Sequence, residues 1–170
     1  MGINTQGNNH KHSVHTGGRH DVRIAIGCDD AAIELKDILK AHVEEKGIEI
    51  VDFSVTGNEA DVDYPDVAHE VARRIGNGEF ERGILLCGTG IGMAIVANKV
   101  PGVRAAVCHD VYSAERSRMS NNAQVIAMGA RVIGPELAKT LLDTWLESEF
   151  QAGRSAPKVA KIDKIDDEYR

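Results

Sequence analysis

Residues 83–99, GILLCGTGIGMAIVANK, decide the fold prediction, because they join a strand directly to a glycine-rich turn and a helix of small residues. The first five residues are almost wholly apolar, which is typical of a parallel strand buried on both faces. The turn holds three glycines within five residues, so its backbone can approach a ligand without interference from Cβ atoms. Unpaired N–H groups at the start of the following helix favour an anionic ligand.

Strand and helix patterns alternate on both sides of this segment. Such alternation predicts βαβ units and a parallel sheet covered by helices on both faces, which is an α/β fold with three layers, α/β/α. The expected strands are residues 22–27, 48–53, 83–87, 103–108 and 124–128, and the expected helices follow Asp30, Pro65, the glycine turn, Asp110 and Pro135, with a last one over 156–169.

The composition predicts a single globular domain. The chain has 170 residues, of which 42% are hydrophobic, and this suits one domain over residues 21–170. Residues 1–20 are rich in Gly, Asn and His and have no hydrophobic periodicity, so we expect a disordered extension there.

Charge and cysteine content exclude several classes of protein. The formal net charge of −6 gives no support to nucleic-acid binding. No apolar run has the length of a transmembrane helix or the place of a signal peptide, so we expect no membrane partner. The three cysteines have no CxxC spacing, which indicates free thiols in a cytoplasmic protein.

Cys87 ends the buried strand and directly precedes the glycines. The positive field of the turn favours the thiolate form of a cysteine at this place. A thiolate beside amides that stabilise an oxyanion suits nucleophilic attack or proton abstraction next to a carbonyl. The alternative is a buried structural cysteine at a strand end. The adjacent glycines favour the functional interpretation.

A dinucleotide site is another interpretation of the same turn, since Asp110 follows it by about twenty residues, as an acidic residue does in Rossmann nucleotide sites. The glycine spacing disagrees with that interpretation, because GTGIG is G-x-G-x-G and not G-x-G-x-x-G. The turn also follows the third strand and not the first.

Other polar residues follow the predicted strands at the edge where parallel sheets bind ligands. Asp29 and Asp30 follow the first strand, where either can cap the next helix or bind sugar hydroxyls. Arg131, Arg154 and Lys158 are the cations that we assign to a phosphate, with Arg154 expected on a loop.

The blocks ILLCGTGIGMAIVANKVPGVRAAVCHD, NNAQVIAMGARVIG and GRSAPKV resemble the ribose-5-phosphate isomerase B / galactose-6-phosphate isomerase family, and the similarity extends over residues 22–168. The resemblance implies a Rossmann-like homodimer without metal or cofactor, in which each active site is built from both subunits; a tetramer stays open. It also implies an aldose–ketose isomerase that works through a cis-enediolate.

The resemblance assigns a role to each candidate residue. Cys87 is the catalytic base that moves a proton between C2 and C1, and Thr89 and Asp29 assist at the hydroxyls. Some members use a glutamate as the base. This chain has Met93 at that position, so the glutamate is absent here. The residues assigned to substrate, enediolate or phosphate binding are Asp30, Gly88, Gly90, Ile91, Gly92, His109, Asn121, Arg131, Arg154 and Lys158.

Two positions depart from the family pattern. Asp30 stands where the first-strand motif usually has a histidine, and Ser120 stands where the family has the histidine that opens the furanose ring. Serine cannot act as an acid or base near pH 7, although His109 is a candidate to compensate. A tetrose with phosphate on O4 cannot close a five-membered ring, so it needs no such acid.

The sequence also resembles the branch of the family that acts on erythrulose 4-phosphate, in its segments HDVYSAER and SNNAQ. We therefore expect the interconversion of D-erythrulose 4-phosphate and D-erythrose 4-phosphate. The alternatives are isomerisation of ribose 5-phosphate or galactose 6-phosphate, or a non-catalytic subunit that only binds a sugar phosphate.

Overall fold

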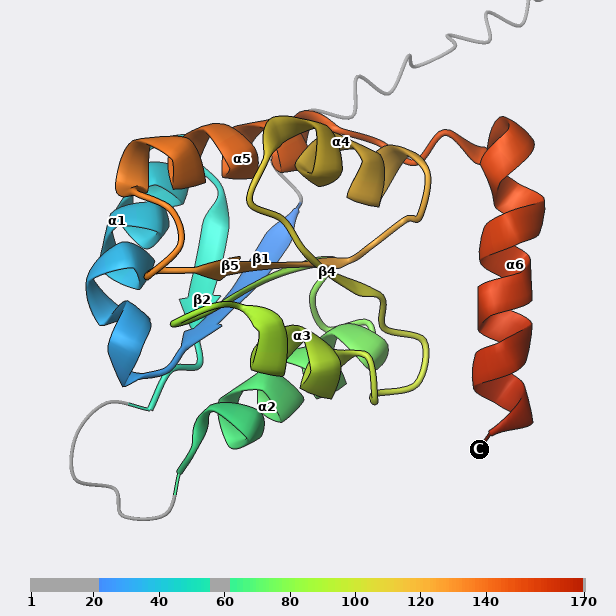
Figure 1. Cartoon of the computed structure of the whole chain (residues 1–170), viewed down its shortest axis with the longest axis horizontal. Helices are drawn as coiled ribbons and strands as arrows, with labels where there is room; N and C mark the ends of the chain where they lie inside the picture. The colour runs from blue at the N-terminus through green and yellow to red at the C-terminus, as the bar shows by residue number, and fades with distance from the viewer. Residues whose placement is uncertain (1–21, 56–61, 170) are drawn as a thin grey trace, which may run out of the picture.

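A computed structural model describes residues 22–55 and 62–169 of the chain. At its centre lies a five-stranded sheet in the order β2-β1-β3-β5-β4, with every neighbouring pair parallel (Figure 1). The predicted disordered extension over residues 1–20 lies outside the described residues. The strands are β1 (Arg23–Cys28), β2 (Glu49–Asp52), β3 (Arg82–Cys87), β4 (Ala105–Val107) and β5 (Val125–Gly129).

Helices cover both faces of the sheet, as Figure 1 shows. Helices α1, α4 and α5 lie on one face, and α2 and α3 lie on the other. The predicted α/β/α architecture with a parallel five-stranded sheet is therefore confirmed. The helices are the short 3-10 helix η2 (Asp30–Ala32), α1 (Ile33–Glu44), α2 (Tyr64–Gly76), α3 (Ile91–Ala97), α4 (Val111–Met119), α5 (Pro135–Glu147) and α6 (Ala152–Glu168). None of the described helices is long and apolar enough to cross a membrane.

Two apolar cores separate the three layers. Along β1, Ile24 and Ile26 pack toward α1 and α5, while Ala25 points to the opposite core beneath α2. Trp145 on α5 is fully buried in the first core. Alternation along a strand that is buried on both faces gives this arrangement, and it brings the carboxyl ends of β1, β3 and β5 to one edge.

Of the two aspartates that could cap the first helix, Asp29 does so, because its Oδ1 accepts a hydrogen bond of 3.0 Å from the N–H of Ala31. One local prediction was wrong. Arg154 lies in α6 and not on a loop, since the helix begins at Ala152 and continues across a non-helical Gly153.

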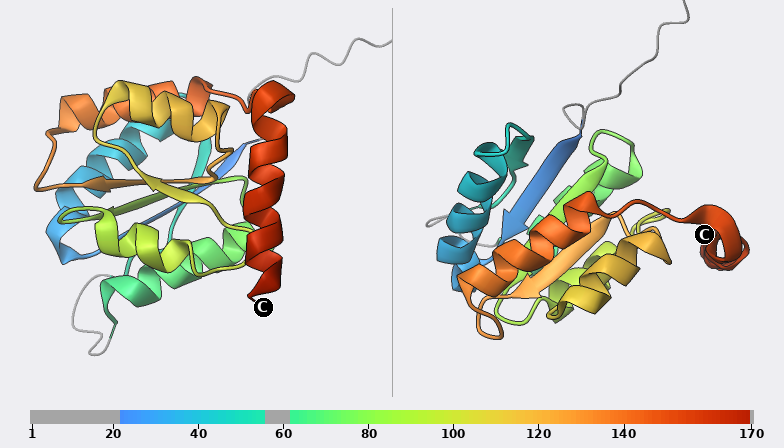
Figure 2. Two further views of the ribbon diagram at one scale, coloured as in Figure 1. Left: turned by 45° about the vertical axis from the view of Figure 1, so that its right-hand side comes forward. Right: turned by 90° about the horizontal axis from the view of Figure 1, so that it is seen from above.

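Helix α6 stands beside the layers and covers no face of the sheet (Figure 2). An ion pair of 2.6 Å between Asp163 and Arg104 joins it to the body of the protein, as does a hydrogen bond from the Gly102 N–H to Asp166. Val159 is its one side chain that is buried in the described part of the chain. The first turn of α6 lies next to the end of α4, where the Gln151 N–H donates to the Met119 carbonyl over 3.0 Å.

Candidate active site

Cys87 lies at the carboxyl end of the central strand β3, where its side chain is 6% exposed. The Gly90 N–H donates a hydrogen bond of 3.0 Å to its Sγ. Gly90 has a φ of 77°, and a Cβ there would lie 2.9 Å from the Met128 backbone, so the turn requires glycine. An amide donor directed at sulfur stabilises a thiolate, which is the form that acts as a base.

The rest of the glycine turn is held by its own side chains and by α2. The Ile91 N–H donates to Thr89 Oγ1 over 3.3 Å, so two of the turn amides that we assigned to the enediolate, those of Gly90 and Ile91, have partners within the turn. Thr89 is exposed. A Cβ at Gly92 would lie 2.6 Å from the ring of Tyr64, which therefore packs directly on this turn. Nothing in the sequence pattern indicated this role for Tyr64.

Asp29 and Arg131 lie at the same edge as Cys87. The Asp29 N–H donates to the Leu86 carbonyl over 3.1 Å, and the Arg131 N–H donates to the Gly88 carbonyl over 3.0 Å. The Arg131 side chain lies against Gly88, where a Cβ would be 3.4 Å from its Cδ. Burial raises the pKa of Asp29, opposed by its hydrogen bond from Ala31 and less strongly by the charge of Arg131. The structure thus brings a thiol, a carboxylate and a guanidinium together.

His109 reaches this edge from the end of β4. Its Nε2 accepts a hydrogen bond of 2.9 Å from the N–H of Gly129, the residue that pairs with Cys87 in the sheet. In this arrangement His109 joins β4 to β5, which is a structural role, while Asp30 is exposed at the start of η2.

The side chains of the other two cysteines are buried in the core on the opposite face of the sheet from Cys87. Burial raises the pKa of the Cys28 thiol and raises that of Cys108 to about 11. All three thiols are free, as predicted. Cys87 is the one that also has an amide donor on its sulfur from a glycine turn.

Three other predicted site residues lie together at the opposite edge of the sheet, namely Asn121, Arg154 and Lys158. A cavity of about 530 Å³ lies between the end of α4 and the start of α6, and we call it the cationic cavity. Its lining contains three cations and no carboxylate. The lining residues are Arg116, Ser120, Asn121, Gln151, Gly153, Arg154, Ser155, Lys158, Val159 and Ile162.

Sheet geometry separates the cationic cavity from Cys87 within one chain. Asn121 precedes β5, whose first residue, Val125, pairs with Gly83 at the start of β3. Cys87 pairs with Gly129 at the other end of β5. The four steps along β5 alone span about 13 Å. Asn121, Arg154 and Lys158 therefore do not meet Cys87 in the single chain, whereas Arg131 does.

Arg116 is a residue of the cationic cavity that the sequence analysis missed. Its Nη2 donates a hydrogen bond to Ser120 Oγ, one helical turn further along α4. The spacing of four residues between the two side chains was the signal that could have indicated this contact.

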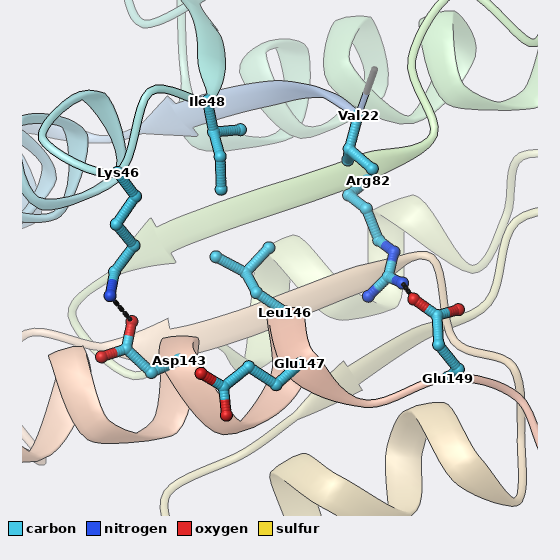
Figure 3. Close-up of a pocket in the computed structure, with 8 residues that line it drawn as sticks. All are labelled: Val22, Lys46, Ile48, Arg82, Asp143, Leu146, Glu147 and Glu149. Carbon is cyan, nitrogen blue, oxygen red and sulfur yellow. Dashed lines mark hydrogen bonds and ion pairs between the residues drawn. The ribbon is translucent and has the colours of Figure 1, made fainter. Parts of the chain in front are cut away.

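A second cavity of similar size lies at the amino ends of β1 and β3, beneath α5 (Figure 3). Ion pairs flank it, one of 3.2 Å between Lys46 and Asp143 and one of 3.2 Å between Arg82 and Glu149. None of the predicted site residues lines this cavity.

Comparisons with known proteins agree on one group of enzymes. Residues 24–162 match the family model described as Ribose/Galactose Isomerase. A D-erythrulose-4-phosphate isomerase of Pectobacterium atrosepticum is 60% identical over 139 residues, which cover 82% of this chain and 91% of that protein. A ribose-5-P isomerase B of Listeria innocua is 54% identical over 149 residues, which cover 88% and 100% of the two chains.

Solved structures give the same result for the fold. The ribose-5-phosphate isomerase B of Clostridium thermocellum superimposes with a TM-score of 0.84 at 47% identity, over 88% of this chain and 100% of that one. A Mycoplasma genitalium ribose-5-phosphate isomerase B with bound ribulose-5-phosphate superimposes with a TM-score of 0.82 at 33% identity, over 88% and 99%. The family match over residues 24–162 includes Cys87 and the residues that line the cationic cavity.

Proposed function

The chain belongs to the Ribose/Galactose Isomerase family and is a sugar-phosphate isomerase, and we propose that its substrates are D-erythrulose 4-phosphate and D-erythrose 4-phosphate. The observation that carries this choice is Ser120. Its hydroxyl lines the cationic cavity and accepts a hydrogen bond from Arg116, at the position where the family resemblance expects a ring-opening histidine. An erythrose 4-phosphate has no free hydroxyl that could close a five-membered ring, so its isomerase needs no such acid.

Ribose 5-phosphate is the second candidate substrate. The ribose-5-P isomerase B of Listeria innocua is 54% identical and is matched over its full length. Turnover of a ribofuranose requires another ring-opening group, and His109 at the carboxyl edge is the candidate for that role. Its Nε2 is occupied by the Gly129 N–H, which disfavours that role. Galactose 6-phosphate is a further alternative substrate, and its phosphate lies two carbons further along the sugar chain than the phosphate of the tetrose.

The proposed active site takes residues from two copies of the chain. Cys87, Asp29 and Arg131 lie at the carboxyl edge, and the cationic cavity lies at the opposite edge, so a second copy must supply its cavity to complete the site. The carboxyl edge offers a surface for such a copy, because several apolar side chains there are between 36% and 73% exposed. They are Ile91, Val107, Val111, Tyr112 and Val132. A homodimer is the smallest assembly that meets this requirement.

In the proposed reaction the Cys87 thiolate removes the proton from C2 of the aldose. The electron pair of that C–H bond forms the C1–C2 double bond, and the aldehyde oxygen becomes the enediolate oxygen. A proton then passes from O2 to O1 with the help of Thr89 and Asp29. As O2 forms the ketone, the double bond takes the proton back from Cys87 at C1, so atoms and charge balance without an added reagent.

The charge of the substrate fits the rest of the proposed site. Arg154 and Lys158 bind the phosphate, with Asn121 at the adjacent oxygens, because guanidinium and ammonium donors suit a phosphate dianion. Arg131 was assigned to the phosphate from the sequence, but it lies against the glycine turn and not in the cationic cavity. We therefore assign it to the enediolate, together with the turn amides. We place the enzyme in the cytoplasm, where its free thiols stay reduced.

A comparison of kcat/KM for erythrose 4-phosphate and ribose 5-phosphate with the purified chain tests this proposal. We expect the tetrose to be preferred by at least about tenfold. A preference for ribose 5-phosphate would overturn the choice of substrate. Deuterium uptake from solvent at the reacting carbon tests catalysis itself, because a subunit that only binds sugar phosphates would show none.

A further inference from the structure

The side chain of Arg116 is half-buried in the cationic cavity and has no carboxylate partner among the described residues. Its guanidinium donates to Ser120 Oγ and lies 3.7 Å from the Met119 sulfur. Both contacts are to uncharged groups. A cation that is partly removed from water and has no anionic partner gains most when a ligand supplies the opposite charge.

The neighbouring arginines have different surroundings. Arg104 pairs with Asp163 of α6 at 2.6 Å. Arg118, two residues after Arg116, points into the protein and donates to the Ala123 carbonyl over 2.9 Å. Of the arginines on α4, Arg116 alone lines the cationic cavity.

Arg116 and the two other cations of the cavity approach it from different elements. Arg154 and Lys158 are exposed on the first turns of α6, whereas Arg116 extends from α4 beside Ser120. A ligand with its phosphate between α4 and α6 contacts all three cations. A ligand with its phosphate only at α6 contacts two of them.

We propose that Arg116 binds the substrate phosphate and determines the preference for a four-carbon sugar. This inference rests on the proposed function, in which Ser120 stands at the position of the ring-opening histidine. The ring oxygen of a ribofuranose is O4, so we infer that position 120 faces O4 of the substrate. In a tetrose 4-phosphate O4 is the phosphate ester oxygen, so the phosphate lies within reach of the guanidinium beside Ser120. In a pentose 5-phosphate O4 is a hydroxyl or ring oxygen, and the phosphate lies one carbon further along, toward Arg154 and Lys158.

The contact with Ser120 fits this role. The serine hydroxyl accepts from the guanidinium and so holds one of its N–H groups in place while the remaining donors face the cavity. Arginine presents its donors in a fixed plane, which suits bidentate binding of phosphate oxygens. A preset guanidinium loses less side-chain entropy when the ligand binds.

Calorimetric titration of the full chain with two unreactive analogues, erythronate 4-phosphate and ribonate 5-phosphate, tests the proposal with Arg116→Met. A lost charge-assisted hydrogen bond corresponds to a rise in Kd of at least about tenfold for the four-carbon analogue. The Kd of the five-carbon analogue is expected to change by less than about threefold. Arg116→Lys should restore part of the affinity for the four-carbon analogue, because it restores the charge without the planar donors.

Lys161→Met is the matched control, since Lys161 is exposed on α6 and does not line the cavity. It removes one positive charge and should leave both Kd values unchanged. An equal rise for both analogues with Arg116→Met, or no rise for either, would overturn the inference. Failure of the proposed function has a different signature, because it appears in the unaltered enzyme as faster turnover of ribose 5-phosphate, while the ratio of the Kd changes still reports on Arg116.

Discussion

The backbone N–H of Gly90 donates a hydrogen bond of 3.0 Å to the Sγ of Cys87, and the sharp turn that makes this contact exists because Gly90 adopts a φ of 77°. The turn thus combines two properties in three residues. It directs an amide dipole at the sulfur, and it packs so closely on the Met128 backbone that no side chain fits. Substitutions of Cys87 and of Gly90 therefore test the sulfur and the turn independently.

Replacing Cys87 by alanine should reduce kcat by at least about 10²-fold, because a positioned general base contributes roughly 10²–10⁴ in rate. The fold should persist, since the hydrogen bond of the Cys87 side chain lies within this turn and its backbone pairing with β5 is unaffected by the substitution. Circular dichroism and steady-state kinetics measure both. Cys108→Ala is the control, as it removes a buried thiol outside the site. Normal turnover by Cys87→Ala would exclude this sulfur as the base.

Gly90→Ala should lower the free energy of unfolding by more than Gly78→Ala. Both residues have left-handed φ angles, 77° and 76°, but a Cβ at Gly90 would lie 2.9 Å from backbone atoms, whereas nothing lies within 4 Å of one at Gly78. The left-handed conformation alone costs roughly 1–2 kcal/mol, and the clash adds to it at Gly90. Urea unfolding measures the difference. Equal losses of free energy in the two variants would show that the backbone around Met128 shifts to make room for the new Cβ at no cost in stability.

Stability should fall as the pH rises from 9.0 toward 11. Burial raises the pKa of Cys108 from 9.0 to about 11, so in this range the unfolded chain releases the thiol proton and the folded chain keeps it. The stability that this group contributes is complete below pH 9.0 and decreases as the pH approaches its folded-state pKa, by roughly 2–3 kcal/mol in total. Urea unfolding across this range should show a shallower decline for Cys108→Ala. Identical slopes would contradict a raised pKa at Cys108.

Ser120→His should raise kcat/KM for ribose 5-phosphate by about tenfold, because it adds a group that can protonate a ring oxygen near neutral pH. The same change should weaken turnover of erythrose 4-phosphate, since the larger side chain displaces Arg116 from its hydrogen bond. Ser120→Asn is the control for size without titration. A gain of similar size with asparagine would mean that ring opening does not limit the pentose reaction.

The sequence predicted the features of this protein that depend on neighbouring residues. These features are the buried strand that ends at Cys87, the glycine turn, and the alternation of strands and helices. Each can be recognised in a short segment of sequence, because strand burial and turn geometry depend on neighbouring residues. Asp29 was correctly placed at the carboxyl edge for the same reason. The helical position of Arg154 was missed because Gly153 and Pro157 in α6 are residues typical of loops.

The relation between the two clusters depends on topology. In the strand order β2-β1-β3-β5-β4, α4 returns the chain from the carboxyl edge to the amino edge before β5 begins. Asn121 therefore lies at the edge of the sheet opposite to the edge that holds Cys87. The sequence pattern reports only local structure, so it could not give the distance between the two residues. Tyr64 and Arg116 were missed because their contacts with Gly92 and Ser120 depend on side-chain packing, which hydrophobic periodicity does not report.

In the proposed homodimer each active site joins Cys87 of one subunit to the cationic cavity of the other, and complementation between two inactive variants tests this arrangement. Cys87→Ala lacks the base, and Arg154→Met/Lys158→Met lacks the phosphate cations. Co-expression with two different affinity tags allows the mixed dimer to be purified. A dimer with shared sites contains one intact site of two, so we expect about half of the unaltered enzyme's activity. A pure mixed dimer that remains as inactive as its parents would contradict the claim.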